Sequence, residues 1–202
     1  EGIEGIEVLY KVVGNRTAKL SRVQKGESVI ILGPLGNGFS VSEECRRIYI
    51  VGGGVGIAPM LFLASSLRNG NVDLSESKVF VGGKTKDDLL CEDDFSPLGI
   101  GVQRTTDDGS AGEKCFVTEA LDRAMAEKKP DIVCACGPFA MLKSVAGIAK
   151  RHHVPCQVSI ETIMACGIGA CLGCAVEKRD NPGKYWHVCV DGPVFDTSLL
   201  KM

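Results

Sequence analysis

From residue 47 onward, hydrophobic and polar residues form blocks that predict strands and helices in alternation. Short apolar runs closed by glycine or charged residues are typical of buried strands, and longer stretches with apolar residues three to four positions apart are typical of helices. Strands are expected at 48–51, 78–81, 101–105, 131–136 and 156–160, and helices at 57–68, 117–127 and 139–151. This alternation predicts a parallel sheet with helices on its faces.

Both ends of the chain depart from this alternation. Near the N-terminus, Ile6–Val13 and Ser28–Leu32 are apolar-rich runs that predict β-strands, and Gly33–Phe39 predicts a loop at a domain boundary. From Glu161 onward, glycines and cysteines replace the helical pattern and enclose two short expected strands, at 175–177 and 187–190. The expected fold class is therefore α/β plus β, with a β segment at 1–40, an α/β domain at 41–160 and a cysteine-rich module at 161–202.

The composition supports a well-filled core and excludes some partners. The 202 residues, 45% of them hydrophobic, suffice for one large or two small domains. A formal net charge of −2 gives no electrostatic basis for binding nucleic acid or an anionic membrane surface. No apolar run approaches the roughly 18 residues that span a bilayer, and ten cysteines without a visible signal peptide indicate reduced thiols in the cytoplasm. Because the first residue is Glu1 rather than Met, we expect the natural N-terminus to precede it.

Four cysteines near the C-terminus carry the strongest chemical signal. Their spacing is C-x4-C-x2-C…C, which is that of a plant-type 2Fe–2S cluster, and they are Cys166, Cys171, Cys174 and Cys189. Glycines between the first three thiols allow a tight loop whose backbone N–H groups point at the cluster. The expected task of such a cluster is to carry one electron at a time.

Two other interpretations of these cysteines stay open at this point. A structural zinc site also takes four thiols, but it usually pairs two CxxC-like knuckles, and this chain has one such spacing, at Cys171 and Cys174. Structural thiols or disulfides are the second alternative, and the lack of a visible secretory signal disfavours disulfides. The other six cysteines are expected to be mostly small buried hydrophobic residues, with Cys136 as the exception.

A glycine-rich turn follows the first strand of the α/β segment, in the run Gly52-Gly53-Gly54-Val55-Gly56-Ile57-Ala58-Pro59. Glycines let the backbone approach a pyrophosphate closely, and the helix after them offers free N–H groups and a favourable dipole. Pro59 fits near the helix start because an N–H there would have no partner. Glycine-rich turns also serve packing alone, but the position directly after a buried strand favours phosphate binding.

A second turn, Cys136-Gly137-Pro138, follows another expected strand. In open α/β sheets, ligands bind at the carboxyl ends of the strands. Taken alone, the turn is equally well explained as a change of direction into the next helix. Beside the glycine-rich turn, it favours contact with the reactive ring of a cofactor.

Taken in order, the glycine-rich turn, the Cys136-Gly137-Pro138 turn and the four cysteines resemble the ferredoxin reductase-like flavoprotein family. More closely, the sequence is similar to the electron-transfer subunits of NAD-dependent (class 1B) dihydroorotate dehydrogenases over essentially the whole chain. Further matching runs are Leu9-Tyr10-Lys11, Asp107–Ser110 and Cys189–Phe195. The resemblance implies an antiparallel β-barrel that binds FAD, a parallel-sheet domain that binds NAD and a C-terminal 2Fe–2S module.

Residue by residue, the resemblance implies three cofactor sites. The FAD contacts would be Leu9, Tyr10, Lys11, Arg16 and Thr17, with Arg16 standing where the family usually has glycine. The pyridine nucleotide phosphates would lie against Gly53, Gly54, Gly56 and Pro59, and the nicotinamide and flavin beside Cys136, Gly137 and Pro138. The iron ligands would be Cys166, Cys171, Cys174 and Cys189. The family's barrel begins well before Tyr10 and carries an Arg-x-Tyr/Pro-Ser motif that this sequence lacks, so only the C-terminal part of the barrel is expected at 1–40.

The resemblance also implies a partner and a direction of electron flow. A dihydroorotate dehydrogenase catalytic subunit, in a heterotetramer of two plus two, would deliver electrons through 2Fe–2S to FAD and then to NAD+ in pyrimidine biosynthesis. A flavin belongs between the other two because it exchanges both hydride and single electrons. No residue of this chain is expected to be catalytic on the substrate, and Cys136 and Glu161 are candidates for the electron-transfer environment only.

Three alternatives stay open. The small subunit of another flavin/iron–sulfur reductase, of the ferredoxin:NADP oxidoreductase or sulfide dehydrogenase type, shares this architecture, but those relatives tend to place Asp where Cys166 stands. Lys84 and Lys86 follow a strand where a 2′-phosphate could be read, so NADP is the alternative nucleotide. A metal-binding module without flavin is the non-enzymatic alternative.

Overall fold

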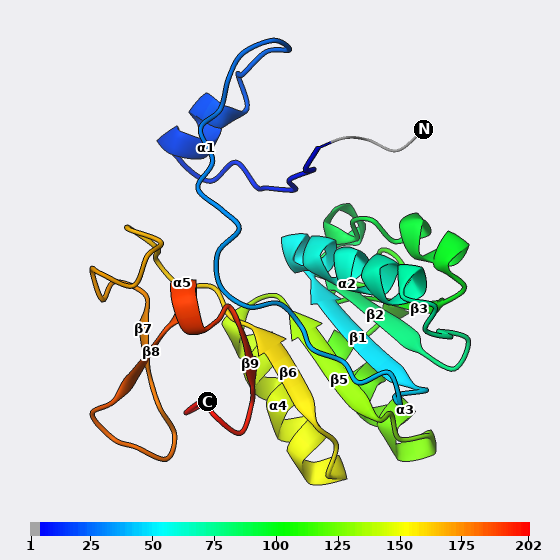
Figure 1. Ribbon diagram of the computed structural model, residues 1–202. Coiled ribbons are helices and arrows are strands. Elements are labelled where there is room, and N and C mark those ends of the chain that lie inside the picture. Colours follow the sequence, from blue (N-terminus) through cyan, green and yellow to red (C-terminus); the bar gives the residue numbers. More distant parts are fainter. Residues whose placement is uncertain (1–4) are drawn as a thin grey trace. The chain divides into compact units, whose positions relative to one another are not determined.

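The computed structural model describes residues 5–202, and the chain divides into two compact units between Gly33 and Pro34. Within the described residues, the second unit forms a seven-stranded sheet in the order β4-β3-β2-β1-β5-β6-β9 (Figure 1). Its strands are β1 (Ile48–Gly53), β2 (Lys78–Gly83), β3 (Gly101–Thr106), β4 (Glu113–Lys114), β5 (Ile132–Cys136), β6 (Cys156–Ser159) and β9 (Val194–Asp196). Every pair from β4 to β6 is parallel, and β9 joins β6 antiparallel. The expected parallel α/β domain is confirmed.

Helices cover both faces of this sheet. They are α2 (Ile57–Asn69), α3 (Val117–Glu127) and α4 (Phe139–His152). Along β1, Ile48 and Ile50 pack toward α2, whereas Tyr49 and Val51 pack toward α3 and α4, and all four are buried. A strand covered on both faces is apolar at every position, which makes such strands visible as continuous runs in the sequence. No helix in residues 5–202 is long and apolar enough to cross a membrane.

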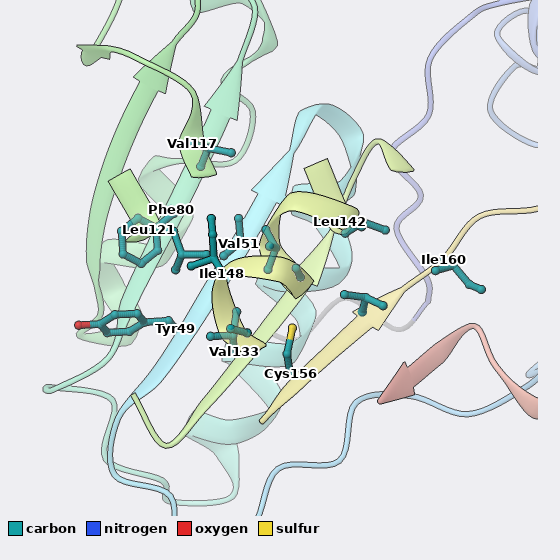
Figure 2. Close-up of a cluster of buried hydrophobic side chains, with 14 of the residues drawn as sticks. Tyr49, Val51, Phe80, Val117, Leu121, Val133, Leu142, Ile148, Cys156 and Ile160 are labelled. Carbon is teal, nitrogen blue, oxygen red and sulfur yellow. The ribbon is translucent and has the colours of Figure 1, made fainter. Parts of the chain in front are cut away.

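The larger hydrophobic cluster lies between the sheet and the α3–α4 layer. Figure 2 shows Leu121 of α3 and Ile148 of α4 facing the side chains of the sheet. Tyr49 and Phe80, on neighbouring strands, meet edge to face with ring centroids 5.3 Å apart. The Tyr49 hydroxyl donates to the carbonyl oxygen of Lys128 at 2.9 Å, so its one polar group is satisfied at the margin of the cluster. This packing fixes the strands relative to one another and thereby the positions of their carboxyl ends.

Asp131 ties the start of β1 to the start of β5. Its Oδ2 accepts the backbone N–H of Arg46 at 2.7 Å and that of Arg47 at 2.8 Å, and its own N–H donates to the Arg47 carbonyl oxygen at 2.8 Å. The hydrogen bonds from Arg47 and Arg46 lower the pKa of Asp131, because they stabilise the ionised carboxylate. Arg47 also forms an ion pair with Glu76, which lies just before β2.

The first unit differs from expectation. Residues 5–33 contain no strand: the expected strands Ile6–Val13 and Ser28–Leu32 are irregular, and a short helix, α1 (Asn15–Leu20), lies between them. Residues 1–4 of the expected 1–40 barrel segment lie outside the described residues. A strand requires a neighbouring strand to pair with, and the described chain offers these runs none, which leaves Ile30 fully exposed. The prediction of these two barrel strands is therefore wrong for this chain.

The C-terminal segment is partly as expected. The hairpin β7 (Ala175–Glu177) and β8 (Tyr185–His187) forms a second, antiparallel sheet (Figure 1). The strand expected at 187–190 ends early, because Val188–Asp191 turns into the short helix α5. The Asp191 carboxylate accepts the His187 backbone N–H at 2.7 Å, and Gly192 N–H donates to the Val188 carbonyl oxygen at 3.2 Å. These two hydrogen bonds close the turn and set the direction of Cys189.

Replacing Asp131 with Asn tests its role at the edge of the sheet. A carboxylate whose pKa is lower in the folded than in the unfolded chain stabilises the fold above about pH 4, and that stabilisation is lost as the pH falls through the folded-state pKa. We expect Asp131→Asn to lower the urea midpoint at pH 7 and to reduce the drop in midpoint between pH 5 and pH 2.5. Asp180→Asn, at an exposed carboxylate, is the control and should leave both unchanged. An unaltered acid limb in Asp131→Asn would contradict the assignment.

Candidate functional site

The glycine-rich turn lies at the carboxyl end of β1. Gly53 is the last residue of the strand, Gly54–Gly56 form a single 3-10 turn, and α2 begins at Ile57. Gly54 has φ of +54°, a left-handed conformation in which glycine carries no steric cost. Pro59 lies in the first turn of α2, where backbone N–H groups have no partner within the helix. The turn therefore presents free N–H groups and the positive end of the helix dipole at the edge of the sheet.

The Cys136-Gly137-Pro138 turn lies directly against the glycine-rich turn. Gly52 is opposite Cys136 in the parallel pairing of β1 with β5. A Cβ atom on Gly56 would lie 2.6 Å from the Cys136 carbonyl oxygen, and one on Gly53 would lie 2.8 Å from the Met141 Sδ and 2.9 Å from the Pro138 Cδ. The two turns thus lie so close together that neither Gly53 nor Gly56 has room for a side chain.

The Cys136 side chain is half-buried where β5 ends. The pairing of β5 with β6 places Ser159 opposite Cys136, and Ser159 hydrogen-bonds to its thiol. Burial raises the pKa of the Cys136 thiol above its ordinary value, the Ser159 hydrogen bond opposes this shift, and the nearby Glu161 carboxylate adds to it. The thiol is therefore neutral at physiological pH. Two sequence-predicted residues, Cys136 and Glu161, are close enough to influence each other.

The four predicted cluster cysteines come from three places in the fold. Cys166 and Cys171 lie in the loop after β6, Cys174 directly precedes β7, and Cys189 lies in α5 directly after β8. Pairing of Ala175 with His187 in the hairpin brings Cys174 and Cys189 together, with their Sγ atoms 3.3 Å apart. Both of these thiols are buried, whereas Cys166 is half-buried and Cys171 exposed.

Backbone N–H groups of the loop point at the thiols. Positive φ angles at Gly167, Gly169 and Leu172 curl the loop back on itself. Hydrogen bonds from the backbone at Ile168 and Cys171, together with the Cys171 thiol, lower the pKa of Cys166 to about 6. Gly169 N–H donates to the Cys189 Sγ at 3.3 Å, and Gly173 N–H donates to the Cys171 Sγ at 3.4 Å.

The second pair of thiols shares its hydrogen bonding unequally. The Cys189 backbone N–H lowers the pKa of Cys174, whereas the hydrogen bond with the Cys174 thiol and burial raise the pKa of Cys189. Cys174 is therefore the thiol of this pair that ionises more readily. Thiolates are the form that binds iron, so the loop favours the metal-binding state at both Cys166 and Cys174.

The thiols are arranged as two pairs rather than around one point. Cys166 hydrogen-bonds to Cys171, and Cys174 to Cys189. In residues 5–202 no three Cys, His, Asp or Glu side chains converge tightly enough for a single metal ion. A zinc site requires such convergence on one ion, whereas a 2Fe–2S cluster has two irons that each take two of the four thiolates. The donor set and its pairing therefore fit a two-iron cluster.

The predicted FAD contacts belong to the first unit of the chain. Leu9, Tyr10 and Lys11 lie in its irregular segment before α1, and Arg16 and Thr17 lie in α1 itself. The Thr17 hydroxyl accepts the N–H groups of Val13 at 3.0 Å and Gly14 at 3.2 Å and donates to the Gly14 carbonyl oxygen. These hydrogen bonds engage the Thr17 hydroxyl in capping the N-terminus of α1. The Arg16 guanidinium has no ion-pair partner in the described chain.

Sequence reasoning missed several residues at these sites. Ser159 and Met141 are in contact with the Cys136-Gly137-Pro138 turn, and strand register, which places Ser159, is not legible in a single sequence. The loop of thiols is also flanked by exposed apolar side chains. This apolar collar consists of Ile163, Met164, Ile168, Leu172 and Val190. In the sequence, the collar is visible as apolar residues that alternate with the cysteines. The same pattern would be expected if these apolar residues were buried in a core, so the sequence alone does not identify an exposed surface.

Comparison with known proteins places these features in one family. Residues 161–201 match the model of the iron–sulfur cluster binding domain of dihydroorotate dehydrogenase B, and residues 50–147 match that of an oxidoreductase NAD-binding domain. The dihydroorotate dehydrogenase B (NAD+) electron transfer subunit of Caldanaerobacter subterraneus is 43% identical over 193 residues, which cover 95% of this chain and 74% of that protein. The chain belongs to the family of these electron-transfer subunits.

A further relative and two solved structures agree with this architecture. A probable subunit of the same kind from Methanopyrus kandleri is 39% identical, over 96% of this chain and 70% of that protein. The structure of an NADH-dependent reduced ferredoxin-NADP oxidoreductase matches with a TM-score of 0.80 and 37% identity, over 93% of this chain and 65% of that chain. The cytochrome b5 reductase domain of Ulva prolifera nitrate reductase, with a TM-score of 0.57 and 21% identity, shares the fold. The ferredoxin reductase-like architecture with a C-terminal iron–sulfur domain is thereby confirmed.

Adding one methyl group at Gly56 tests the nucleotide loop. Because its Cβ would lie 2.6 Å from the Cys136 carbonyl oxygen, Gly56→Ala must displace one of the two turns. We expect the Kd for NADH, measured by calorimetric titration, to rise about tenfold or more, which corresponds to about 1.4 kcal/mol. Gly101→Ala is the matched control, since a Cβ there has no neighbour within 4 Å. An unchanged Kd in a folded Gly56→Ala protein would show that this loop does not hold the nucleotide.

Replacing single thiols tests the cluster. We expect Cys174→Ser and Cys189→Ser to lower bound iron and acid-labile sulfide well below two of each per chain, because each substitution removes a ligand from the buried pair. Cys45→Ser, at a half-buried cysteine outside the loop, should retain both. Iron and sulfide assays and the visible absorbance spectrum provide the measurement. Zinc in place of iron and sulfide in the unmutated protein would contradict the two-iron assignment.

Proposed function

We propose that this chain is the electron-transfer subunit of an NAD-dependent dihydroorotate dehydrogenase. It passes electrons from a catalytic subunit through 2Fe–2S and FAD to NAD+ in pyrimidine biosynthesis. The observation that carries this proposal is the short connection between the two sites of the second unit. Strand β6 ends at Ser159, beside Cys136, and the same chain segment reaches the first cluster thiol at Cys166.

The connection gives each site its place in the relay. Glu161 and Thr162 lie midway along it, and Glu161 raises the pKa of Cys136. The Thr162 hydroxyl is buried without a hydrogen-bond partner in the described chain, as expected of a group that faces a cofactor. The segment is thus a short covalent route between the carboxyl edge of the sheet and the cluster thiols.

Three groups supply the redox chemistry when bound: NAD accepts hydride, FAD exchanges both hydride and single electrons, and 2Fe–2S carries single electrons. The chain itself binds and orients them. The backbone of Gly53, Gly54 and Gly56, followed by Pro59, holds the pyrophosphate of the nucleotide. Cys136, Gly137 and Pro138 form the neutral wall beside the nicotinamide and flavin. The FAD contacts are Leu9, Tyr10, Lys11, Arg16 and Thr17, and the iron ligands are Cys166, Cys171, Cys174 and Cys189.

The chain is not expected to perform acid–base chemistry on the substrate. His152 is engaged with the Asp122 carboxylate at 2.7 Å, and the Asp191 carboxylate lies 3.8 Å from the Nδ1 of His187. Proton transfer from dihydroorotate is therefore left to the catalytic subunit. This division is consistent with the glycines at the proposed nucleotide site and the thiols at the proposed iron site.

The apolar collar supports docking of the catalytic subunit at the cluster. Ile163 is 83% exposed, Ile168 65% and Leu172 64%, and they lie in the same segment of the chain as the exposed thiol of Cys171. Exposed apolar side chains gathered at one place are typical of a protein interface. Docking there would bring the partner's flavin toward the cluster and exclude water from it. We expect a heterotetramer of two catalytic and two electron-transfer subunits, located in the cytoplasm.

A second candidate is the small subunit of an NADH-dependent ferredoxin:NADP oxidoreductase. It is favoured by the TM-score of 0.80 and the 37% identity to such a structure. The fourth thiol, Cys166, favours the dihydroorotate pathway, because the reductase relatives tend to carry Asp at that place. Lys84 and Lys86, beyond the end of β2, are the residues to examine if NADP proves to be the nucleotide.

Coexpression with a dihydroorotate dehydrogenase catalytic subunit tests the proposal. We expect a complex with flavin and 2Fe–2S absorbance that reduces NAD+ with dihydroorotate. Leu172→Glu in the apolar collar should reduce this activity at least about tenfold while leaving NADH–ferricyanide activity intact, because only the first reaction crosses the interface. Phe62→Glu, at a side chain 76% exposed on α2, is the matched control and should affect neither. Reduction by ferredoxin and not by dihydroorotate would favour the second candidate instead.

A further inference from the structure

A cleft of about 500 Å³ lies on the second unit away from both redox sites. One wall is the outer side of α4, and the other is formed by the chain beyond β7 and β9. Its floor includes Cys156, the first residue of β6, and Asp196, the last of the antiparallel β9. The cleft therefore lies toward the amino ends of the parallel strands, whereas the glycine-rich turn lies at their carboxyl ends. Its volume is that of pockets that hold small organic ligands.

Three cationic side chains line this cleft. Lys143 and Lys150 are seven residues apart on α4 and so share one side of the helix, and Arg179 faces them from the segment after β7. Neither lysine has an ion-pair or hydrogen-bond partner for its amine in the described chain. Arg179 donates one hydrogen bond, from Nη1 to the Ser198 carbonyl oxygen at 3.3 Å, and its remaining N–H groups are unused. Three positive charges thus converge on one opening.

The surrounding acidic groups only partly offset these cations, because a single carboxylate side chain lines the cleft with them. Asp196 is the one carboxylate among the lining residues, and its Oδ1 accepts the Ser198 N–H at 2.7 Å. Of the acidic residues nearby, Glu177 pairs with Lys201 at 2.9 Å and Asp122 with Arg151 at 2.8 Å. Lys150 also lies in the last turn of α4, where the helix dipole favours a cation, but Lys143 lies nearly two turns earlier and gains nothing from it.

The remainder of the cleft is apolar and open. Ala146, Val154 and Pro155 contribute carbon surface between the cations. Gly147 lies on α4 between Lys143 and Lys150, and a Cβ built there would meet no atom within 4 Å. Glycine in a helix interior weakens the helix by about 1 kcal/mol relative to alanine, and nothing in the packing of α4 requires it here. Its effect is to leave the space above the helix empty.

We propose that this cleft is a binding site for a phosphate monoester with an apolar or aromatic body. A monoester carries nearly two negative charges at pH 7 and three acceptor oxygens, which match the three cations. Its organic part would rest on Ala146, Val154 and Pro155 above Gly147. Such a ligand would bridge α4 to Arg179, which lies in the loop between β7 and β8. The pairing of these two strands holds Cys174 and Cys189 together. The inference does not depend on the proposed electron transfer, so each can fail without the other.

Calorimetric titration of the full chain with phenyl phosphate tests the site directly. We expect saturable binding with a Kd below about 1 mM at constant ionic strength. Inorganic phosphate, which lacks the apolar body, and phenol, which lacks the charge, should each bind at least about tenfold more weakly. Absence of saturation by phenyl phosphate would overturn the proposal, and so would equal affinity for inorganic phosphate.

Two variants separate charge from space in the cleft. Lys143→Ala/Lys150→Ala should weaken phenyl phosphate binding about tenfold or more, whereas Lys114→Ala/Lys129→Ala removes the same charge elsewhere and should not. Gly147→Leu fills the open space without changing the charge, its Cβ meets no atom within 4 Å, and it should abolish binding while preserving or raising the Tm. Retention of affinity in Gly147→Leu would place the ligand outside the cleft and refute the assignment.

Discussion

The parallel pairing of β1 with β5 places Gly52 beside Cys136, and the arrangement of the nucleotide edge follows from this register. Strands β1 and β5 end at neighbouring points of the sheet, and the backbone continues from β1 into α2 and from β5 into α4. The two turns pass so close that Gly53 and Gly56 have no room for a side chain. A shift of one residue in the pairing would separate the turns and reverse the faces of every side chain in the strand. The burial of β1 on both faces by two hydrophobic clusters holds the register in place.

A second constraint orders the iron site. The loop after β6 holds two thiols, but the other two are brought together by the β7–β8 hairpin and the turn at α5. Because β6 is also the strand next to β5, one short segment connects the two sites. The order of the strands therefore brings the two sites near each other in the chain, without a separate linking domain.

Five strands of the central sheet, β1, β2, β3, β5 and β6, could be predicted from the sequence because each is recognisable on its own, whereas the short strands β4 and β9 were not expected. Ile48–Val51 is apolar at successive positions, as a strand covered on both faces requires. Ile6–Val13 has a similar composition, yet it forms no strand in the described chain, because pairing depends on a neighbour that the run itself does not encode. Composition therefore identifies a segment able to form a strand, but the partner decides whether it does.

The sites were predictable to different degrees for related reasons. The spacing of the cysteines and glycines is a local property, so the sequence alone predicts them as candidate site residues. Ser159, Met141 and the cations of the α4 cleft come together only through strand register and helix packing. The sequence predicts a strand at 187–190 because the apolar residues there fit either pattern, and the hydrogen bond from the His187 N–H to the Asp191 carboxylate favours the turn that the structure shows.

The division of the thiols between a loop and a hairpin has a consequence for how the metal centre is assembled. Cys166 and Cys171 are separated by one short loop and can meet early in folding. Cys174 and Cys189 meet only after β7 has paired with β8. In the proposed cluster, one iron would take both protein ligands from a single short loop, whereas the other would take its ligands from the two ends of a hairpin. Assembly of that cluster would therefore depend on the fold of the last forty residues.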